Sequence, residues 1–410
     1  MQRDNREELT FMKKNIVHFI RKKLKVFYRN LFWKFIEKPA ATILYFLHPQ
    51  KNRIVLDNFN GKGYGGNPMY IAEEIHKINK NIQLVWLVDN IESFEFPDYI
   101  KVVKVDSILG LYMRATARVW VDNIRHRHPV KKKESQLYLQ TWHGSMGVKK
   151  IEKDAESKLP KEYIKQAKYD GQIIDAIIAD NYLQEKIYKR SFWLNNKVII
   201  LRFGFPQNDL IENKKSDKDF ISQMKIKFLF DDAYYYVLYA PTFRDDYSMD
   251  CYNLDFDRII SAFEKSVGKP TKIVLRLHPN VSYQKEHIKF SNNVLDGTDY
   301  PNIQELALVV DAVISDYSST LFDFALLNKP AFICALDFEK YEESRGFIPE
   351  FFDLPFKICK SNDELIKTIN NFRYDEYKKE LFKFYQKYPV YGEGDSARKT
   401  AHWILNKICI

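Results

Sequence analysis

The sequence contains little cysteine, glycine or proline and no long apolar run. Four cysteines in a chain of 410 residues are too few and too scattered for a disulfide framework or a CxxC metal site, and such low usage is typical of a reducing compartment. Fourteen glycines and fifteen prolines exclude a collagen-like or low-complexity chain. No apolar stretch approaches the roughly 18–20 residues that a membrane-spanning helix needs, and no small-residue cleavage site of a signal peptide follows the N-terminal residues.

Positive charge is in excess, and most of the excess lies near the N-terminus. The chain has 64 Lys and Arg against 54 Asp and Glu, a formal net charge of +10. Residues 11–38 alone contain nine Lys or Arg and one acidic residue, a net charge of +8, so the remainder is close to neutral. An excess of basic residues predicts an anionic partner. Its concentration in one segment favours an anionic membrane surface over nucleic acid.

The same N-terminal segment has the periodicity of an amphipathic helix. Six apolar residues recur at helical spacing on one face, and basic residues fall mainly on the opposite face. Such a helix is typical of a protein that lies on a membrane without crossing it; the alternative is an ordinary helix packed on the domain, with a solvated basic face. We expect residues 1–48 to attach the protein peripherally to the cytoplasmic face of the cell membrane. The apolar stripe consists of Ile16, Ile20, Leu24, Phe27, Leu31 and Phe35.

Short apolar segments alternate with helical ones through the rest of the chain, which predicts an α/β fold with parallel sheets. A charged stretch at residues 214–225 separates two runs of this pattern. We therefore expect α/β domains at residues 49–213 and 214–390, and a final helical segment at residues 391–410 that packs back across both. The expected strands are residues 53–57, 83–88, 101–105, 119–121, 137–141, 173–179 and 198–201 in the first domain, and 234–239, 272–277, 308–314 and 331–335 in the second.

A glycine turn follows the first expected strand. Gly61, Gly63 and Gly66 fit the pattern G-x-G-x-x-G between a strand and a helix, and Asp89 lies at the end of the next strand, as in proteins that bind nicotinamide dinucleotides. Any parallel α/β unit also needs a tight turn here. The turn therefore has three interpretations: a dinucleotide site, a loop whose Gly63 and Gly65 let an acceptor approach the backbone, or a purely structural turn.

A histidine follows directly on the strand expected at residues 137–141. His143, in Trp142-His143-Gly144-Ser145, then lies at the carboxyl edge of a parallel sheet, where such sheets bind ligands. Histidine is the side chain best suited near neutral pH to take a proton from an attacking hydroxyl. The alternative is a buried structural histidine beside a core tryptophan. The candidate acceptor-binding residues are Gly63, Gly65, Gly144, Ser145, Lys149 and Lys150.

Three strand ends in the second domain carry residues suited to phosphate, and Thr242 and Arg244 follow the first of them. Arg276 and His278 lie at the end of one expected strand, two residues apart, so their side chains are expected on the same face of the sheet. A guanidinium together with an imidazole suits a phosphate or diphosphate. Asp316 ends another strand and is followed by hydroxyl residues that open a helix, whose first amide groups favour phosphate. The alternatives are solvated strand ends and an ordinary helix cap. The candidate donor-binding residues are Thr242, Arg244, Arg276, Asp316, Ser318, Ser319 and Thr320.

Two further motifs leave a functional and a structural interpretation equally open. Residues 392–396, which contain two glycines, precede the final helix and suit either a phosphate site or an ordinary cap. The basic run at residues 125–128, with three lysines at 131–133, is expected in a loop. There it either attracts a polyanionic acceptor or is simply solvated.

Four motifs, taken together and in order, resemble those of the CDP-glycerol glycerophosphotransferase family, which includes the teichoic acid primases and polymerases of Gram-positive bacteria. They are WHGS at residues 142–145, APTFRDD at 240–246, RLHP at 276–279 and SDYSST at 315–320. The resemblance implies a GT-B fold, in which two Rossmann-like domains face a cleft and the donor nucleotide binds mainly to the second. Many members have a segment of the Pro-Leu-Lys type where this chain has residues 145–149, which leaves the acceptor and the polyol open.

The resemblance also implies an activity. It predicts a transferase that moves a polyol phosphate, with glycerol phosphate preferred, from CDP-glycerol or CDP-ribitol to a hydroxyl of a lipid-linked glycan or teichoic-acid-type polymer, with release of CMP. It assigns catalytic roles to His143 and His278 and donor-phosphate contacts to Ser318 and Ser319. We expect no metal or other cofactor, since no carboxylate cluster suggests one, and no nucleic acid partner. The alternatives are a GT-B glycosyltransferase that uses a nucleotide sugar, a non-enzymatic binder of acidic polymers, and a nicotinamide-dependent enzyme.

Overall fold

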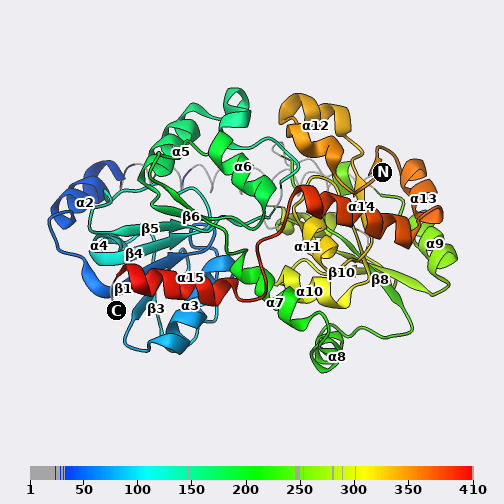
Figure 1. The fold of residues 1–410 in the computed structure, drawn as a ribbon, viewed down its shortest axis with the longest axis horizontal. Coiled ribbons are helices and arrows are strands. Elements are labelled where there is room, and N and C mark those ends of the chain that lie inside the picture. Colours follow the sequence, from blue (N-terminus) through cyan, green and yellow to red (C-terminus); the bar gives the residue numbers. More distant parts are fainter. Residues whose placement is uncertain are drawn as a thin grey trace, which may run out of the picture.

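The computed structural model contains two parallel β-sheets that lie side by side, each with helices packed on its faces (Figure 1). This is the α/β architecture that the alternation of apolar and helical segments predicts. The structure describes Leu24, Tyr28, Leu31 and residues 33–145, 147–244, 250–252, 254–278, 281–288, 290–300 and 302–408.

The first sheet has the strand order β3-β2-β1-β4-β5-β6-β7, and its neighbouring strands are all parallel. The order reverses between β1 and β4, where open parallel sheets bind ligands beyond the carboxyl ends of their strands. The strands are β1 (Gln50–Asp57), β2 (Gln83–Val88), β3 (Ile100–Lys104), β4 (Ala117–Asp122), β5 (Leu137–Gln140), β6 (Ala176–Ile178) and β7 (Ile199–Leu201). The helices of this unit are α3 (Gly66–Ile78), α4 (Ile108–Thr116), α5 (Lys161–Ile173), α6 (Tyr182–Ser191) and α7 (Asp209–Lys214).

The second sheet has the strand order β10-β9-β8-β11-β12-β13 and is also parallel throughout. Its strands are β8 (Tyr235–Tyr239), β9 (Thr271–Leu275), β10 (Val294–Asp296), β11 (Ala312–Ser315), β12 (Ala331–Cys334) and β13 (Ile358–Cys359). The helices of this unit are α8 (Lys218–Lys227), α9 (Phe256–Val267), α10 (Ile303–Val309), α11 (Thr320–Leu326), α12 (Phe338–Ser344), α13 (Asn362–Asn370) and α14 (Tyr374–Lys387), and α15 (Ser396–Lys407) follows at the C-terminal end. Short 3-10 helices lie at Ile91–Ser93, Glu152–Lys158, Pro206–Asn208, Asp250–Tyr252, Ser282–His287 and Pro349–Asp353.

The burial of the strands explains why their apolar residues could be recognised in the sequence. In β1 the residues from Arg53 to Asp57 are all buried, because helices cover both faces of the sheet, and between these two charged residues the strand is a continuous apolar run, Ile54-Val55-Leu56. Each expected strand overlaps an observed one. Strands β10 and β13 were not predicted, since runs of three and two residues are too short to show a pattern.

One expected strand is wrong in part. The sequence predicts a single strand at residues 308–314, whereas residues 308 and 309 end helix α10 and β11 begins at Ala312. The side chain of Asn302 caps α10 by accepting hydrogen bonds from the backbone N–H groups of Gln304 and Glu305. Because the helix buries all its apolar residues from Leu306 onward, it lacks the alternation that separates helix from strand. The strand expected at residues 173–179 is shorter for a similar reason, since α5 extends to Ile173.

The C-terminal residues return to the first unit. The backbone N–H of Tyr391 donates to the carbonyl of Asp180, and Val390 forms a β-bridge with Asn181. Helix α15 then packs against α3, as Figure 1 shows, and its Ala401 and Ile404 join the first core. The final helix therefore covers the first sheet after the chain has passed through the second.

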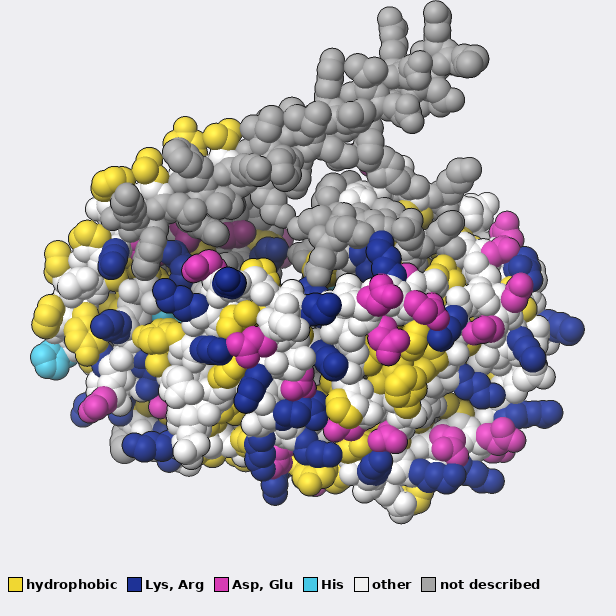
Figure 2. Space-filling model, turned by 90° about the horizontal axis from the view of Figure 1, so that it is seen from above, with side chains coloured by type: hydrophobic (Ala, Val, Ile, Leu, Met, Phe, Trp, Pro, Cys, Tyr) yellow, Lys and Arg dark blue, Asp and Glu magenta, His cyan; other side chains and the backbone are white. Residues whose placement is uncertain are grey.

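The start of the described chain exposes apolar side chains. A π-helix (Trp33–Glu37) leads into α2 (Lys38–Leu44), and the space-filling view shows hydrophobic side chains gathered on the side of the molecule where α2 lies (Figure 2). Leu24, Leu31 and Phe35 of the predicted stripe are exposed; Ile16, Ile20 and Phe27 lie outside the described residues. In the part of the chain that the structure describes, no helix is both long and apolar enough to cross a membrane.

Candidate active site

The two sheets bring the sequence motifs of both domains together at the carboxyl ends of their strands. His143 follows β5 in the first sheet, and His278 follows β9 in the second. A Cβ atom added to Gly144 would lie 2.8 Å from the hydroxyl oxygen of Ser319. The WHGS and SDYSST motifs, far apart in the sequence, are therefore in contact across the two domains.

The imidazole of His143 is held in one tautomer. Its Nδ1 lies 2.8 Å from the backbone carbonyl oxygen of Asn123. Because a carbonyl only accepts hydrogen bonds, Nδ1 carries the proton and Nε2 presents its lone pair. Burial, together with the charge of Lys149, lowers the pKa of His143 to about 4. His143 is therefore neutral at physiological pH and has the form that a general base requires.

A pair of asparagine amides supports this arrangement. The Nδ2 of Asn123 donates to the Oδ1 of Asn58 over 2.7 Å, and the backbone N–H of Phe59 donates to the Oδ1 of Asn123 over 2.9 Å. Phe59 and Asn60 have left-handed backbone angles, with φ of 48° and 60°, which are uncommon for residues other than glycine. The ring of Phe59 lies 5.1 Å from that of His143. Asn123 thus connects the glycine turn to His143. This role was not predicted from the sequence, although Asn123 directly follows β4, at the switch point of the sheet.

Part of the glycine turn packs against the rest of the first domain, so the turn is not open to a ligand along its whole length. Gly61 has φ of 88°, and a Cβ there would lie 2.5 Å from the backbone nitrogen of Asp89. The Nε1 of Trp86 donates to the carbonyl of Gly63 over 3.1 Å, and the ring of Phe94 packs on Gly63. Gly65 precedes α3 and has only an ordinary contact with Asn58. Gly61 and Gly63 therefore have structural reasons to be glycine.

The residues after His143 are anchored in both domains. The hydroxyl of the buried Ser145 is bonded to the carboxylate of Asp180, and the Nε2 of Gln184 donates to the Gly144 carbonyl over 2.7 Å. The N–H of Lys150 donates to the Gly346 carbonyl over 2.9 Å. An antiparallel β-bridge joins Lys149 to Phe347. Ser145 thus fixes the loop to the first sheet, while Lys149 and Lys150 lie against the second domain.

Arg276 and His278 follow β9 in the second domain. Both are half-buried, and the guanidinium of Arg276 donates to the carbonyl of Tyr300. Burial, and then the charges of Lys149 and Arg276, lower the pKa of His278 to about 3. His278 is therefore neutral at physiological pH and able to donate one N–H to a phosphate oxygen. Pro279 of this motif lies outside the described residues.

The hydroxyl residues after β11 lead into α11, whose N-cap residue, Ser319, makes no capping hydrogen bond with its side chain. The backbone N–H of Thr320 donates to the hydroxyl of Ser318 over 3.2 Å, and that hydroxyl also contacts the Thr320 hydroxyl. The carboxylate of Asp316 is buried and accepts from the backbone N–H of Thr242 over 2.8 Å. Ser318 and Asp316 thus have structural partners, while Ser319 faces Gly144 of the first domain.

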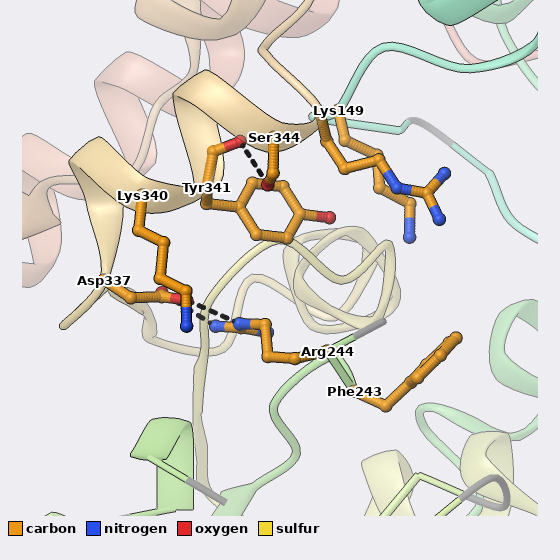
Figure 3. A pocket seen from close by; sticks show the side chains of 8 residues that line it. Lys149, Phe243, Arg244, Asp337, Lys340, Tyr341 and Ser344 are labelled. Atoms are coloured by element: carbon orange, nitrogen blue, oxygen red, sulfur yellow. Dashed lines mark hydrogen bonds and ion pairs between the residues drawn. The ribbon is translucent and has the colours of Figure 1, made fainter. Parts of the chain in front are cut away.

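Arg244 holds the loops of the second domain together. Its guanidinium donates to Asp316 over 2.7 Å and to Asp337 over 2.6 and 2.9 Å, and also to the Thr242 carbonyl. It lies against the rings of Tyr317 and Tyr341. These bonds occupy most of its N–H groups, so Arg244 holds Thr242, Asp316 and Asp337 in place; Figure 3 shows its pairing with Asp337. Asp337 lies 93 residues away in the chain, and its role was not predicted from the sequence. Asp245 and Asp246 lie outside the described residues.

The basic run at residues 125–128 is buried in part: Arg125 and His126 are buried, so for these two the prediction of a solvated run is wrong, whereas Arg127 is exposed. Arg125 is buried and paired with Glu152 over 3.1 Å and Asp170 over 2.7 Å. The Nε2 of His128 lies 2.5 Å from Asp170. The acidic partners come from distant segments, and only they make burial of these charges possible.

No group of three or more His, Cys, Asp or Glu side chains in the described residues forms a metal-binding arrangement. The chemistry that these residues can perform is proton transfer and the binding of anions. The neutral imidazoles, Arg276 and the hydroxyl residues at the domain contact suit a reaction in which a hydroxyl attacks a phosphate.

Comparisons with known proteins agree with this geometry. The family model of CDP-glycerol:poly(glycerophosphate) glycerophosphotransferases matches residues 40–406. The teichoic acid glycerol-phosphate transferase of Staphylococcus aureus is 30% identical over 92% of this chain and 99% of its own. The teichoic acid poly(glycerol phosphate) polymerase of Staphylococcus epidermidis is 29% identical over 84% of this chain. The chain spans about half, 49%, of the length of that polymerase and of its Bacillus subtilis counterpart.

The solved structure of the wall teichoic acid polymerase TagF superposes with a TM-score of 0.79 and 26% identity, covering 96% of this chain and 98% of that one. The two parallel sheets match TagF, which confirms the predicted GT-B-like α/β fold. The family predicted from the four motifs is confirmed as well: the chain belongs to the CDP-glycerol:poly(glycerophosphate) glycerophosphotransferase family.

Proposed function

We propose that this protein transfers a polyol phosphate, with glycerol phosphate as the preferred group, from a CDP-polyol to a hydroxyl of a membrane-linked acceptor and releases CMP. The observation that carries the proposal is the His143 imidazole. It is neutral, presents Nε2, and belongs to a loop in contact with Ser319 of the proposed donor site. Membership in a family of transferases argues against a non-enzymatic polymer binder and against a nicotinamide-dependent enzyme.

In the proposed reaction, Nε2 of His143 accepts the proton of the acceptor hydroxyl. The hydroxyl oxygen forms a bond to the β-phosphorus of the CDP-polyol, and the bond from that phosphorus to the oxygen bridging the two phosphates breaks. CMP leaves with the bridging oxygen, and a phosphodiester is formed. Such transfers depend mainly on positioning and on stabilisation of charge.

The proposed division of labour follows the two sheets. Residues 49–213 hold the acceptor through Gly63, Gly65, Gly144, Ser145, Lys149 and Lys150. Residues 214–390 hold the CDP donor, and residues 391–410 fasten the two units. Arg276, His278, Ser318, Ser319 and Thr320 contact the donor phosphates, while Thr242, Arg244 and Asp316 hold that site in shape.

We also propose that the N-terminal segment, residues 1–48, attaches the enzyme peripherally to the cytoplasmic face of an anionic membrane, where a lipid-linked glycan or teichoic-acid-type polymer is the acceptor. Ile43 and Phe46 are 71% and 76% exposed, next to the basic N-terminal sequence. Exposed apolar residues beside cations suit a lipid surface. Flotation with vesicles containing anionic lipid tests this attachment: Ile43→Glu/Phe46→Glu should lower binding, and wild-type-like binding would refute it.

A donor panel tests the activity. Purified protein with a lipid-linked acceptor is incubated with CDP-glycerol, CDP-ribitol and UDP-sugars, and the products are identified by mass spectrometry. We expect CMP release from CDP-glycerol. Ribitol-phosphate polymerases of Bacillus spizizenii and S. aureus also match, at 24% and 23% identity, so CDP-ribitol is included. Transfer from a UDP-sugar alone would identify a GT-B glycosyltransferase instead, and normal CMP release by His143→Ala would refute the role of His143.

A further inference from the structure

Trp142, the residue directly before His143, has an unusual backbone conformation. Its φ is 57°, in the left-handed region that residues other than glycine seldom adopt. A bulky residue in this region is strained, and such strain persists only where the surrounding structure holds it in place. The left-handed conformation of Trp142 must therefore be fixed by groups around it.

The bend at Trp142 determines where His143 points. In an extended strand, successive side chains point to opposite faces. Here the rings of Trp142 and His143 are instead in contact, with centroids 4.4 Å apart, and the imidazole reaches the carbonyl of Asn123. The Trp142 ring also packs on the buried Phe192, with centroids 4.7 Å apart. The bend thus keeps the tryptophan in the core while it turns the imidazole toward its hydrogen-bond partner.

Both backbone polar groups of Trp142 are hydrogen-bonded to side chains. Its N–H donates to Oε1 of Gln140 over 3.0 Å. Its carbonyl oxygen accepts from Nδ2 of Asn67 over 3.0 Å and from the hydroxyl of Thr141 over 2.9 Å. Gln140 and Thr141 lie at the end of β5, whereas Asn67 comes from the first turn of α3, 75 residues earlier in the chain. Of these three partners, Asn67 is the one that ties the bend to another element.

Asn67 is itself held in one orientation. Its side chain is fully buried, and its Oδ1 accepts a hydrogen bond from the backbone N–H of Gln207 over 3.1 Å. Because the amide oxygen only accepts and the amide nitrogen only donates, this bond directs Nδ2 toward the Trp142 carbonyl. Asn67 also lies two residues after Gly65, so it joins the end of the glycine turn to the WHGS motif.

The same arrangement occurs twice around the imidazole of His143. The rings of Phe59 and Trp142 contact it, with centroid distances of 5.1 and 4.4 Å, and both residues have left-handed backbone angles. Each is bonded to a buried asparagine of another segment. The N–H of Phe59 donates to Asn123, and the carbonyl of Trp142 accepts from Asn67.

We propose that Asn67 is a positioning residue for the proposed base: its side-chain amide holds the left-handed Trp142 and so directs His143 to the Asn123 carbonyl. Asn67 acts through the backbone of Trp142 and not by contact with a substrate. The inference rests on the proposed function, because it explains how the base of that reaction is oriented.

The alternative is that Asn67 only joins α3 to its neighbours and has no effect on His143. Asn195 provides the matched control, because its half-buried side chain makes the same kinds of bond elsewhere. Its Nδ2 donates to two backbone carbonyls at the end of α5 over 2.8 and 3.1 Å, and its Oδ1 accepts from the N–H of Lys197 over 2.8 Å. Asn195 precedes β7, so it lies at the amino edge of the first sheet, opposite the edge that carries His143.

The first measurement is CMP release from CDP-glycerol. We expect Asn67→Ala to lower kcat about 10- to 100-fold, since a displacement on the order of 1 Å has an effect of this size, and to leave the KM for CDP-glycerol unchanged. Thr141→Val removes the other donor to the Trp142 carbonyl while it keeps the shape of the side chain, and the loss of one hydrogen bond should lower kcat about 3- to 10-fold. Asn195→Ala should keep the wild-type kcat.

The second measurement follows His143 without turnover. In protein that carries isotope-labelled histidine, NMR shows which ring nitrogen bears the proton, and the spectrum of His143→Gln identifies the signals of His143. We expect the proton on Nδ1 in the wild type and in Asn195→Ala, and a mixture of the two tautomers in Asn67→Ala. Thermal melting of each variant shows whether the fold is retained. If Asn67→Ala does not fold, Thr141→Val decides, with the same direction of change expected in both measurements.

Three results would overturn the inference: wild-type kcat in both Asn67→Ala and Thr141→Val, an equal fall of kcat in Asn195→Ala, or an unchanged tautomer of His143 in folded Asn67→Ala. Failure of the proposed function is a separate outcome. If the wild type releases no CMP from any donor, that function is refuted, and the NMR comparison alone supports or overturns the role of Asn67.

Discussion

Asn123→Ala is expected to weaken both the fold and the reaction, because Asn123 links the glycine turn to His143. The substitution removes two hydrogen bonds, one from Nδ2 to Asn58 over 2.7 Å and one from the N–H of Phe59 over 2.9 Å. Each leaves a partner unsatisfied at a site where Asn123 and Asn58 are buried. At about 1–3 kcal/mol for each lost bond, and toward the lower end for the partly exposed Phe59, the free energy of unfolding should fall by about 2–4 kcal/mol.

The catalytic effect follows from geometry. The carbonyl that orients His143 belongs to the backbone of Asn123, so the substitution leaves the contact in place but frees the segment that holds it. The left-handed Phe59 loses its support at the same time. A displacement on the order of 1 Å costs up to about a hundredfold in rate, so we expect kcat to fall about 10- to 100-fold while the KM for CDP-glycerol changes little.

The assay pairs urea unfolding with CMP release. Asn58→Ala and the double variant complete a cycle: because the two amides share one bond, the double variant should lose less stability than the sum of the single variants. Asn371→Ala is the control, since that exposed asparagine bonds only to Lys367 within its own helix end. A kcat for Asn123→Ala within twofold of wild type, or additive stability losses, would refute the positioning role.

Three further predictions concern the same site. Burial and the charge of Lys149 hold the pKa of His143 at about 4, so the fall of kcat/KM at acid pH should be centred near that pH rather than near 6.5. Lys149→Gln removes a like charge and should move this fall to higher pH. A pH profile of the variant that matches the wild type would contradict the prediction. Arg244→Ala leaves the carboxylates of Asp316 and Asp337 without their partner and should cost about 3–5 kcal/mol of stability, measured by urea unfolding, whereas a loss under 1 kcal/mol would show that the ion pairs are dispensable. Gly144→Ala places a Cβ 2.8 Å from the Ser319 hydroxyl and should raise the KM for CDP-glycerol in initial-rate assays. Ser319→Thr adds bulk at the same contact and should have a similar effect. An unchanged KM in both variants would exclude Ser319 from donor binding.

The sequence was sufficient for the elements that local pattern determines. Continuous apolar runs predicted the buried parallel strands, and a histidine directly after such a run, as at His143, had to lie at the carboxyl edge of the sheet. The motif order then led to the correct family. Prediction failed where a helix is buried along its apolar length, as in α10, because periodicity then no longer separates helix from strand.

Long-range partners could not be predicted from local pattern. Arg244 looked like a ligand at a strand exit, but Asp316 and Asp337, which come from two other strand ends, occupy its guanidinium. Arg125 looked like part of a solvated basic loop, yet it is neutralised by Asp170, 45 residues away. In both cases the role of a charge depends on what tertiary folding brings to it. A single sequence does not contain that information.

The contact between the two domains also determines where Lys149 lies. Lys149 belongs by sequence to the histidine loop of the first sheet, but its neighbours are bonded to the second domain, through the Lys150 N–H to Gly346 and the Ile348 N–H to the Val148 carbonyl. Any displacement of α12 relative to the first sheet must therefore either break these two bonds or carry Lys149 along. After burial, the charge of Lys149 also lowers the pKa of His143, so the same two bonds contribute to keeping the base neutral. The reactivity of His143 is thus a property of the two domains in contact and not of the first domain alone.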